Sequence, residues 1–268
     1  MDNVHGSKVL EIRKYKNKQF YQQEDLLAIE APLEIQLVRF VDGEWVNKSI
    51  SITMRTPGND QALAIGFLMT EGIIHESSQV DDVAIPSENI VVVQLTQSTA
   101  VDIDKLDRNF YTTSSCGVCG KTSIDLVKTK IPFDLSLFSL NIPFEKLLNL
   151  QDQLLGEQSL FSQTGGIHAA ALFDENLILQ DVQEDVGRHN ALDKLIGGAF
   201  MKKNVPLKNH LLLVSGRASF ELVQKAAMAG IPMMVAIGAP STLAVELAEE
   251  AGMKLVGFLK KTGFNVYC

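Results

Sequence analysis

Two cysteines that stand two residues apart are the most reactive feature of this sequence. Cys116 and Cys119 lie in the stretch TTSSCGVCGK, where glycine, serine and threonine surround both thiols. Such small residues give a loop conformational reach with little steric bulk. Arg108 and Lys121 are near in sequence, and neighbouring cations favour the nucleophilic thiolate. The stretch therefore predicts a mobile loop that presents a nucleophilic thiol.

Zinc binding is one chemistry that paired cysteines serve. A closed structural zinc site needs a second pair of Cys or His ligands, but Cys268 stands alone at the last position and the five histidines are not spaced as pairs. A zinc deaminase needs a glutamate two residues after its histidine, and the residue at that distance from His168 is Ala170. We therefore expect no metal site in this chain.

Disulfide exchange and sulfur transfer are the other chemistries open to the pair. In a thioredoxin-like protein, a C-x-x-C motif lies near a βαβ pattern, whereas here it follows a segment with a small α+β pattern. A thiolate can instead receive a sulfur atom as a persulfide, and a second thiol can assist its release by the chemistry of thiol–disulfide exchange. The residues by themselves leave both roles open.

Two strand-to-helix loops in the second half carry residues suited to phosphate. Gly216 and Arg217 occupy the first loop, and Gly238 and Ser241 occupy the second. Helix N-termini attract anions, and ligands of parallel sheets bind beyond the carboxyl ends of the strands. Ordinary helix capping explains each loop taken alone, and neither common nucleotide fingerprint is present. Together with the arginine, the loops indicate a ligand that bears phosphate.

The segment EDVGRHNALDKL places a cation at the start of a predicted helix. Asp185 can cap this helix, and Arg188 and His189 fall in its first turn. A cation there opposes the helix dipole, so we expect Arg188 to meet an anion, which is Asp185, Glu184 or a ligand. An exposed polar helix start is the simpler alternative.

Alternating patterns in the first half predict a small α+β domain over residues 1–110. Its first 30 or so residues are polar and charged, which indicates a loose arm or an edge strand, and Asp42-Gly43 is a hairpin turn signal. Asn59 or Asp60 begins the predicted helix and Gly72 ends it. The predicted strands span residues 33–41, 45–54, 89–95 and 100–106.

The remainder predicts a linker over residues 111–140 and an α/β domain over residues 141–268. Strands alternate with helices at a spacing typical of βαβ units and a mostly parallel sheet. The predicted helices span residues 144–161, 188–203, 219–230 and 241–252. The predicted strands span residues 168–173, 177–182, 210–216, 233–238 and 254–259.

Composition narrows the class of protein. The 268 residues carry a net charge of −8, which argues against binding of nucleic acid through phosphate neutralisation. No apolar run approaches the ~18 residues of a membrane span, and the first 20 residues lack the apolar stretch of a signal peptide. Three cysteines are too few for a disulfide framework. We expect a cytoplasmic protein.

Taken together, the motifs resemble one family. SSCGVCGK, GGIHAAALF, EDVGRHNALDKLIG, SGRASFELVQKAAMAGIP, AIGAPSTLAVELAEEAG and LVGFLKKTGFNVY, between Leu33 and Tyr267, are similar to the FdhD/NarQ family. The resemblance implies a sulfur carrier that accepts sulfur from a cysteine desulfurase as a persulfide on Cys116, with Cys119 as the second thiol. It implies delivery to the molybdenum bis(guanine dinucleotide) cofactor of formate dehydrogenase, whose apoenzyme is then a partner.

The resemblance also implies a fold, a binding segment and an oligomeric state. The C-terminal domain is expected to be a three-layer α/β domain similar to cytidine deaminase, and the protein a homodimer. The family's cofactor-binding segment corresponds to FLKKTG, which comprises Phe258, Leu259, Lys260, Lys261, Thr262 and Gly263. Guanosine diphosphate mimics one arm of the cofactor, and Arg217 and Ser241 are further candidates to bind it. Cys268 has no counterpart in this resemblance. The alternatives are a zinc- or nucleotide-binding module without transfer activity and a thiol–disulfide oxidoreductase.

Overall fold

The computed structural model describes residues 6–99, 101, 129–138 and 140–268. Cys116 and Cys119 lie outside these ranges, together with Arg108, Lys121 and nearly all of the strand predicted over residues 100–106. No helix within the described ranges is both long and apolar enough to cross a membrane.

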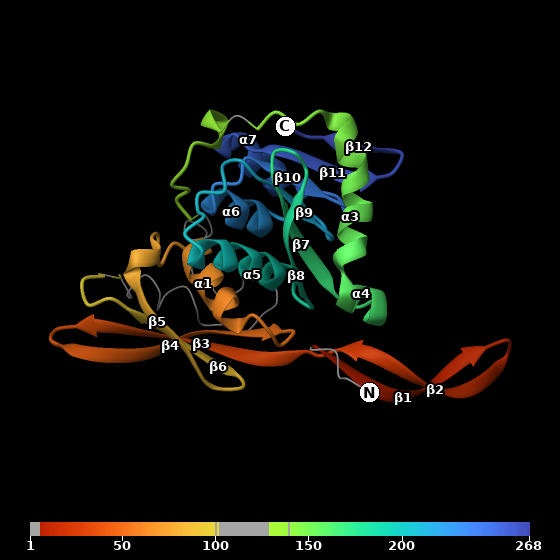
Figure 1. Ribbon diagram of the computed structural model, residues 1–268, viewed down its shortest axis with the longest axis horizontal. Helices are drawn as coiled ribbons and strands as arrows, with labels where there is room; N and C mark the ends of the chain where they lie inside the picture. The colour runs from red at the N-terminus through yellow and green to blue at the C-terminus, as the bar shows by residue number, and fades with distance from the viewer. Residues whose placement is uncertain (1–5, 100, 102–128, 139) are drawn as a thin grey trace.

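The strands of the described residues form three sheets (Figure 1). A two-stranded ribbon contains β1 (Ser7–Lys16) and β2 (Gln19–Ala28). The four-stranded sheet runs in the order β4 (Glu44–Arg55), β3 (Ala31–Val41), β6 (Ile90–Leu95) and β5 (Val80–Ser87). The six-stranded sheet runs in the order β12 (Gly263–Val266), β11 (Lys254–Lys260), β10 (Met233–Ala236), β9 (Leu211–Val214), β7 (His168–Phe173) and β8 (Leu179–Asp185).

Helices connect and cover these sheets. The α-helices are α1 (Asp60–Thr70), α3 (Leu150–Glu157), α4 (Ser159–Thr164), α5 (Arg188–Met201), α6 (Phe220–Met228) and α7 (Thr242–Ala251). Short 3₁₀ turns span Ser77–Gln79 (η1), Leu135–Leu137 (η3) and Phe144–Asn149 (η4). The mixed α/β class predicted from the sequence is confirmed.

The six-stranded sheet lies between two helical layers. One face, with Leu212 and Met234, packs in the larger core with α1, α5, α6 and α7. The other face, with Leu213 and Val235, packs against Leu150 and its neighbours in α3 and η4. Alternating side chains of each strand therefore enter opposite cores, as the two-residue period of a strand requires.

The sheet is parallel at its centre and antiparallel at its flanks. Strands β9, β10 and β11 are parallel, whereas β7, β8 and β12 pair antiparallel with their neighbours. A tight turn at Asp174–Leu177 joins β7 to β8, and a turn this short cannot make a parallel crossover. The expectation of a mostly parallel sheet therefore holds for the centre alone.

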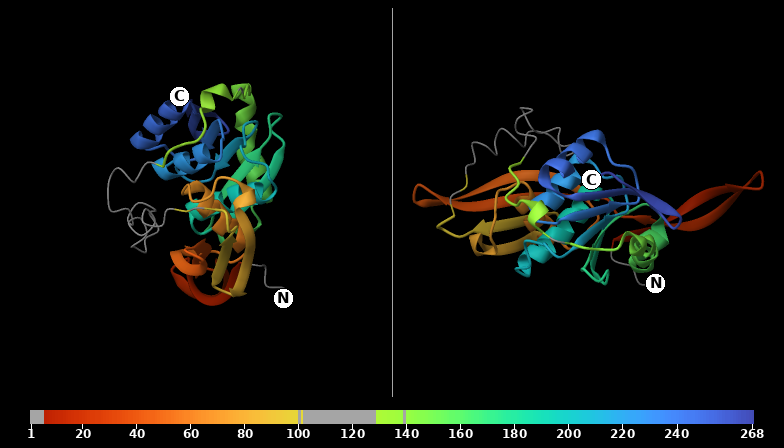
Figure 2. Two further views of the ribbon diagram at one scale, coloured as in Figure 1. Left: turned by 90° about the vertical axis from the view of Figure 1, so that its left-hand side faces the viewer. Right: turned by 90° about the horizontal axis from the view of Figure 1, so that it is seen from above.

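The N-terminal segment forms an ordered ribbon where the sequence predicts a loose arm or an edge strand. β1 and β2 pair along their whole length from Ser7↔Ala28 to Lys16↔Gln19. Asn17 and Lys18 both have positive φ, which is the backbone of a type I′ hairpin turn. The ribbon extends beyond the body of the molecule in Figure 1 and in the right-hand view of Figure 2.

Two further elements differ from what the sequence predicts. The single helix predicted over residues 144–161 is interrupted at Gln158, because the Glu184 carboxylate accepts hydrogen bonds from the Leu160 and Phe161 amides and starts α4 anew. Strand β5 was not expected from the sequence, because its two aspartates and Pro86 are uncommon in strands.

A close crossing of α1 and α5 joins the four-stranded sheet to the rest of the molecule. A Cβ on Gly66 would overlap the Asp193 carbonyl, and a Cβ on Gly197 would overlap the Ala62 carbonyl. Only glycine at both positions lets the two helix backbones touch. The contact sets the position of α5 relative to α1.

We expect Gly197→Ala to destabilise the protein, because the added methyl group must push the two helices apart. The free energy of unfolding should fall by about 2 kcal/mol, a usual cost of overpacking. Gly198→Ala is the control, because the nearest atom to its new Cβ lies 3.8 Å away. That change should raise stability by about 0.5–1 kcal/mol, since alanine is the better helix former. Equal effects of the two substitutions in chemical denaturation would contradict the close crossing.

Candidate functional site

The loops that follow the three parallel strands lie against one another. Gly238 N–H donates to the Gly216 carbonyl at 2.9 Å, and Ser241 N–H donates to the Ala218 carbonyl at 3.0 Å. Phe258 N–H donates to the Gly238 carbonyl at 3.0 Å. We call these loops, residues 215–219, 237–241 and 257–262, the carboxyl edge. The structure therefore brings together three of the predicted binding positions, those of Arg217, Ser241 and Phe258.

Gly238 permits the close contact between the first two loops. A Cβ at this position would lie 2.9 Å from the Gly216 carbonyl oxygen and 3.0 Å from Arg217 Cα. Arg217 and Ser241 are both exposed. Ser241 is the N-cap of α7 and its hydroxyl accepts the Ala244 amide at 3.3 Å, so ordinary capping accounts for this hydroxyl. The edge keeps one exposed guanidinium beside a helix N-terminus.

Phe258 has an unusual backbone conformation. Its φ is 55°, in the left-handed region, and the β11–β12 pairing is irregular between Gly257 and Lys260. A bulky residue is rare there, and such strained positions cluster at functional sites. The residue is 41% exposed. The irregular strand thus leaves an aromatic surface at the carboxyl edge, available for stacking on a base.

The rest of the predicted FLKKTG segment forms the end of β11 and its turn. Leu259 is buried in the smaller core, so its side chain packs within the protein. Lys260 and Thr262 are exposed. Lys261 Nζ lies 2.9 Å from Asp152 Oδ1 of α3 in an exposed ion pair, a kind of contact that contributes little stability. A phosphate at Lys261 would therefore compete with a weak existing partner. Gly263 begins β12.

His168 and Arg188 flank the same edge near Gly216. A Cβ on Gly216 would lie 3.5 Å from His168 Nδ1 and 3.9 Å from Arg188 Cδ. Burial, followed by the nearby Arg188 cation, lowers the pKa of His168, and Asp185 opposes that effect. His168 is therefore neutral at neutral pH, and Arg188 supplies positive charge on this side of the edge.

His189 makes a contact that the sequence did not indicate. Its Nε2 lies 3.2 Å from Glu221 Oε2 and 3.5 Å from Ser219 Oγ. Burial lowers the pKa of His189 to about 3, and the cations of Arg188 and Lys225 add to the effect. Because the imidazole is neutral at neutral pH, the contact with Glu221 is a close approach of polar atoms and not an ion pair. An acidic residue in the first turn of α6 is ordinary for a helix start, so no sequence pattern indicated the contact between His189 and Glu221.

Asp185 and Glu184, the two protein anions expected near Arg188, have defined structural tasks. Asp185 is buried and its carboxylate lies 2.7 Å from Lys194 Nζ, while the Thr56 and Gly187 amides donate to it at 3.1 and 2.8 Å. Glu184 caps α4. An exogenous anion at Arg188 stays a prediction.

The chain on either side of the cysteine segment is tied to the body. Arg39 Nη1 donates to the Val101 carbonyl at 3.4 Å. Thr129 exchanges two hydrogen bonds with the buried side chain of Gln224 in α6, at 3.1 and 3.0 Å. The residues that flank the segment with Cys116 and Cys119 are thus fixed to β3 and α6.

Cys268 lies in a setting that suppresses its reactivity. Its thiol donates to the Met253 carbonyl at 3.2 Å, and burial raises its pKa. A thiol of raised pKa is a poor nucleophile near neutral pH. Across the described residues, no group of three or more His, Cys, Asp or Glu side chains is arranged to hold a metal ion.

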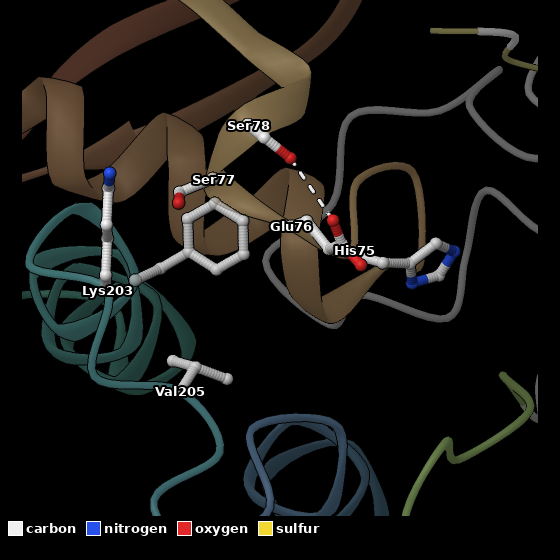
Figure 3. Close-up of a pocket in the computed structure, with 7 residues that line it drawn as sticks. His75, Glu76, Ser77, Ser78, Lys203 and Val205 are labelled. Atoms are coloured by element: carbon white, nitrogen blue, oxygen red, sulfur yellow. Dashed lines mark hydrogen bonds between the residues drawn. The ribbon is translucent and has the colours of Figure 1, made fainter.

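A hollow of about 260 Å³ lies elsewhere, beside the C-terminal end of α5 (Figure 3). Its lining contains both polar and apolar side chains, and Ser78 donates to Glu76 at 3.2 Å across its rim. α5 starts at Arg188 and runs for 14 residues, or about 21 Å, so its two ends are well separated. The hollow therefore lies apart from the carboxyl edge. Its lining residues are His75, Glu76, Ser77, Ser78, Phe200, Lys203 and Val205.

Comparison with known proteins decides the family. The model of the FdhD/NarQ family matches residues 28–268. The chain belongs to the FdhD/NarQ family. A relative from Streptomyces coelicolor, called sulfur carrier protein FdhD, is 47% identical over 253 residues, which are 91% of this chain and 87% of the relative.

Other family members bear the same name across distant organisms. The sulfur carrier protein FdhD of Mycobacterium tuberculosis is 42% identical over 268 residues, covering 96% of this chain and 94% of its own. The sulfur carrier protein FdhD of Sulfurisphaera tokodaii is 38% identical over 262 residues, covering 97% of this chain and 96% of its own. A crystal structure from Desulfotalea psychrophila shares the fold, with a TM-score of 0.72, 23% identity and coverage of 97% and 96%.

The low pKa of His189 makes a prediction about stability. The neutral imidazole of the folded state binds fewer protons than the unfolded one, so this histidine makes folding less favourable as pH falls from about 6.5 toward 3. In that window its contribution changes by about 1.4 kcal/mol for each pH unit.

Replacing His189 with Gln should remove this slope from the difference between variant and wild type in urea titrations at pH 4–7. Carbon-bound imidazole protons give a direct readout by NMR, and those of His189 should not shift between pH 5 and 8. Titration of His189 near its ordinary pKa would contradict the buried neutral ring.

Proposed function

We propose that this chain carries sulfur for the maturation of formate dehydrogenase. The observation that carries the proposal is the family match over residues 28–268. It is supported by relatives that are called sulfur carrier proteins and that match this chain over most of their own length. The segment with Cys116 and Cys119 falls inside that match.

The first step of the proposal loads sulfur on Cys116. The Cys116 thiolate attacks the terminal sulfur of a persulfide on a cysteine desulfurase. The sulfur–sulfur bond of the donor breaks, the donor cysteine leaves as a thiolate, and a persulfide forms on Cys116. No proton relay is needed, because both the attacking and the leaving groups are thiolates.

The second step releases the sulfur. The Cys119 thiolate attacks the inner sulfur of the Cys116 persulfide, which forms a Cys116–Cys119 disulfide and expels hydrosulfide. The two thiols supply the two electrons that reduce the sulfane sulfur to sulfide. The hydrosulfide passes to the metal of the cofactor, which is the substrate here, and a dithiol reductant restores the pair.

The carboxyl edge is the proposed docking site for the molybdenum bis(guanine dinucleotide) cofactor. Arg217 lies beside the N-terminus of α7, and Lys260 and Lys261 stand at the end of β11. Cations and helix N-termini both favour phosphate. The exposed ring of Phe258 offers a face for the guanine base. The proposal also includes a homodimer that acts in the cytoplasm between the desulfurase and the apoenzyme.

Loading tests the role of Cys116. After incubation with a cysteine desulfurase and cysteine, the intact wild-type chain should gain the mass of one sulfur atom, and Cys116→Ser should not. Cys119→Ser should load sulfur but fail to support formate dehydrogenase maturation. Cys268→Ser is the matched control and should behave as wild type, because the Cys268 thiol has a raised pKa.

Three other outcomes would contradict the carrier role. Full maturation of formate dehydrogenase with the Cys116→Ser variant would show that Cys116 does not carry the sulfur. Equal loss of loading in Cys116→Ser and Cys119→Ser, with zinc in the purified protein, would favour a metal module. A disulfide that turns over without any gain of sulfur would favour an oxidoreductase.

Binding of guanosine diphosphate tests the carboxyl edge. The double substitution Lys260→Glu and Lys261→Glu should weaken binding by roughly 10-fold at low salt, since it turns two attractions into repulsions. The loss should shrink as salt rises, because exposed charges are screened. Calorimetric titration at two salt concentrations measures both effects.

A matched control changes the same charge elsewhere. Lys202→Glu with Lys208→Glu alters exposed lysines at and beyond the other end of α5, and should leave the affinity unchanged. Unchanged affinity in the Lys260 and Lys261 variant would indicate that the phosphates bind at Arg217 or Arg188 instead. Absence of nucleotide binding by the wild type would remove the cofactor from the proposal but leave sulfur loading intact.

A further inference from the structure

The β1–β2 ribbon is an unusual structure for a protein to expose. Its base is held, because the Ile29 amide donates to the Gly6 carbonyl at 2.8 Å and β2 contacts α4. Beyond the base, the ribbon stands clear of both larger sheets (Figures 1 and 2). A two-stranded ribbon is marginally stable in water by itself. The ribbon therefore calls for a second surface to cover it.

Apolar side chains occur on both faces of the ribbon. Tyr15 and Phe20 pair across the strands with ring centroids 5.0 Å apart, and the Arg13 guanidinium lies 4.5 Å from the centroid of Phe20. Large side chains of the ribbon that are between 41% and 62% exposed are Val9, Leu10, Tyr15, Phe20, Tyr21 and Leu27. Scattered exposed apolar residues are normal, but this concentration in 22 residues marks an interaction surface.

The outer half of the ribbon has the opposite charge to the rest of the chain. Residues 12–23 hold Arg13, Lys14, Lys16 and Lys18 and no acidic residue, a charge of +4. Because the whole chain carries −8, all other residues together carry −12. A second copy of this chain is therefore an electrostatically matched partner for the ribbon.

The outer face of the four-stranded sheet offers apolar surface to receive the ribbon. Leu33, Ile35 and Leu37 point inward and are buried with α1. The side chains that alternate with these point to the opposite, outer face of the sheet. On that face, Trp45 is 47% exposed and Ile52 is 52% exposed.

Carboxylates accompany that apolar surface. Glu34 pairs in register with Ile52, and Asp82 pairs with Gln94 on the same face. The face thus combines exposed apolar side chains with negative charge, which complements the basic, aromatic ribbon.

The connection between ribbon and sheet suits a reciprocal exchange. β2 ends at Ala28 and β3 starts at Ala31, so ribbon and receiving sheet are nearly continuous. A two-fold axis beside this link lays each ribbon on the other copy's sheet, and both contacts are then the same. Strands of 10 residues reach about 33 Å at ~3.3 Å per residue.

The buried area separates mutual exchange from a single contact. A ribbon about 33 Å long and about 10 Å wide covers roughly 330 Å², counted on both surfaces as about 660 Å². One such contact is smaller than a stable interface, whereas two give about 1,300 Å², within the usual range of roughly 1,200–2,000 Å².

We infer that the β1–β2 ribbon docks on the outer face of the four-stranded sheet of a second copy, and that two copies exchange ribbons. The ribbon precedes the part of the chain that matches the family model, which starts at residue 28. The ribbon therefore lies outside the segment that the family model matches, although relatives that cover 96% and 97% of this chain extend into it. The ribbon contact does not depend on sulfur transfer.

Charge reversal at the ribbon tip is the test. Lys14→Glu, Lys16→Glu and Lys18→Glu together should raise the dimer dissociation constant at least about 10-fold in sedimentation equilibrium of the full chain, since close like charges at an interface disfavour association. Lys146→Glu, Lys202→Glu and Lys208→Glu change the same charge at exposed positions of the body and should leave the constant unchanged. Circular dichroism checks that both variants fold.

A compensating variant makes the test specific. Adding Glu34→Lys and Asp82→Lys to the ribbon variant should restore dimers, and a photo-cross-linker at Phe20 should label residues 45–54 of the other copy. A dimer dissociation constant that does not change when the ribbon charges are reversed would overturn the inference. A wild-type chain that is monomeric at every concentration would also overturn it. Binding of the monomer to duplex DNA or to phosphatidylglycerol vesicles, lost on reversal of the ribbon charges, would assign the ribbon to a polyanion and overturn it too.

Discussion

The crossing of α1 and α5 through Gly66 and Gly197 is the constraint on which the rest of the structure depends. Beside it, Lys225 Nζ lies 2.9 Å from Asp193 Oδ2 and 2.9 Å from Thr70 Oγ1, all of them buried. Although burial works against its charge, the Asp193 and Glu71 carboxylates raise the pKa of Lys225. A buried charge is tolerated only with its partners in place. The network therefore holds α1, α5 and α6 together, and the first residue of α5, Arg188, lies beside the carboxyl edge.

The proposed function assigns two tasks to two different parts of the chain. The proposal places sulfur chemistry in the segment between Val101 and Thr129, and these two residues are tied to β3 and α6. The proposal places recognition of a large anionic cofactor at the carboxyl edge, which hydrogen bonds between neighbouring backbone segments hold together. A carrier that moves sulfur between thiolates needs no acid–base dyad at that edge. His189 is buried and neutral at neutral pH, and its contact with Glu221 lies between the starts of α5 and α6.

Local rules predicted the parts of the fold whose cause is local. Asp42 and Gly43 both have positive φ, as their hairpin turn requires, and the alternation of strands and helices after residue 188 is as expected. The predictions failed where distant residues decide. The break at Gln158 depends on Glu184, and β5 forms because β6 accepts it as a neighbour. The carboxyl edge was predicted from its glycines and Arg217, whereas the contacts Lys261–Asp152 and His189–Glu221 join elements that no sequence pattern connects.

Hydrogen–deuterium exchange of the full chain, with and without guanosine diphosphate, tests most directly whether the carboxyl edge binds the cofactor. We predict slower exchange in peptides that cover residues 215–219, 237–242 and 257–263, with little change in the β1–β2 ribbon or around the hollow at the end of α5. These loops are exposed and their amides include helix N-termini, so a bound phosphate would protect them. Protection confined to another region, or unchanged exchange at saturating nucleotide, would contradict the account.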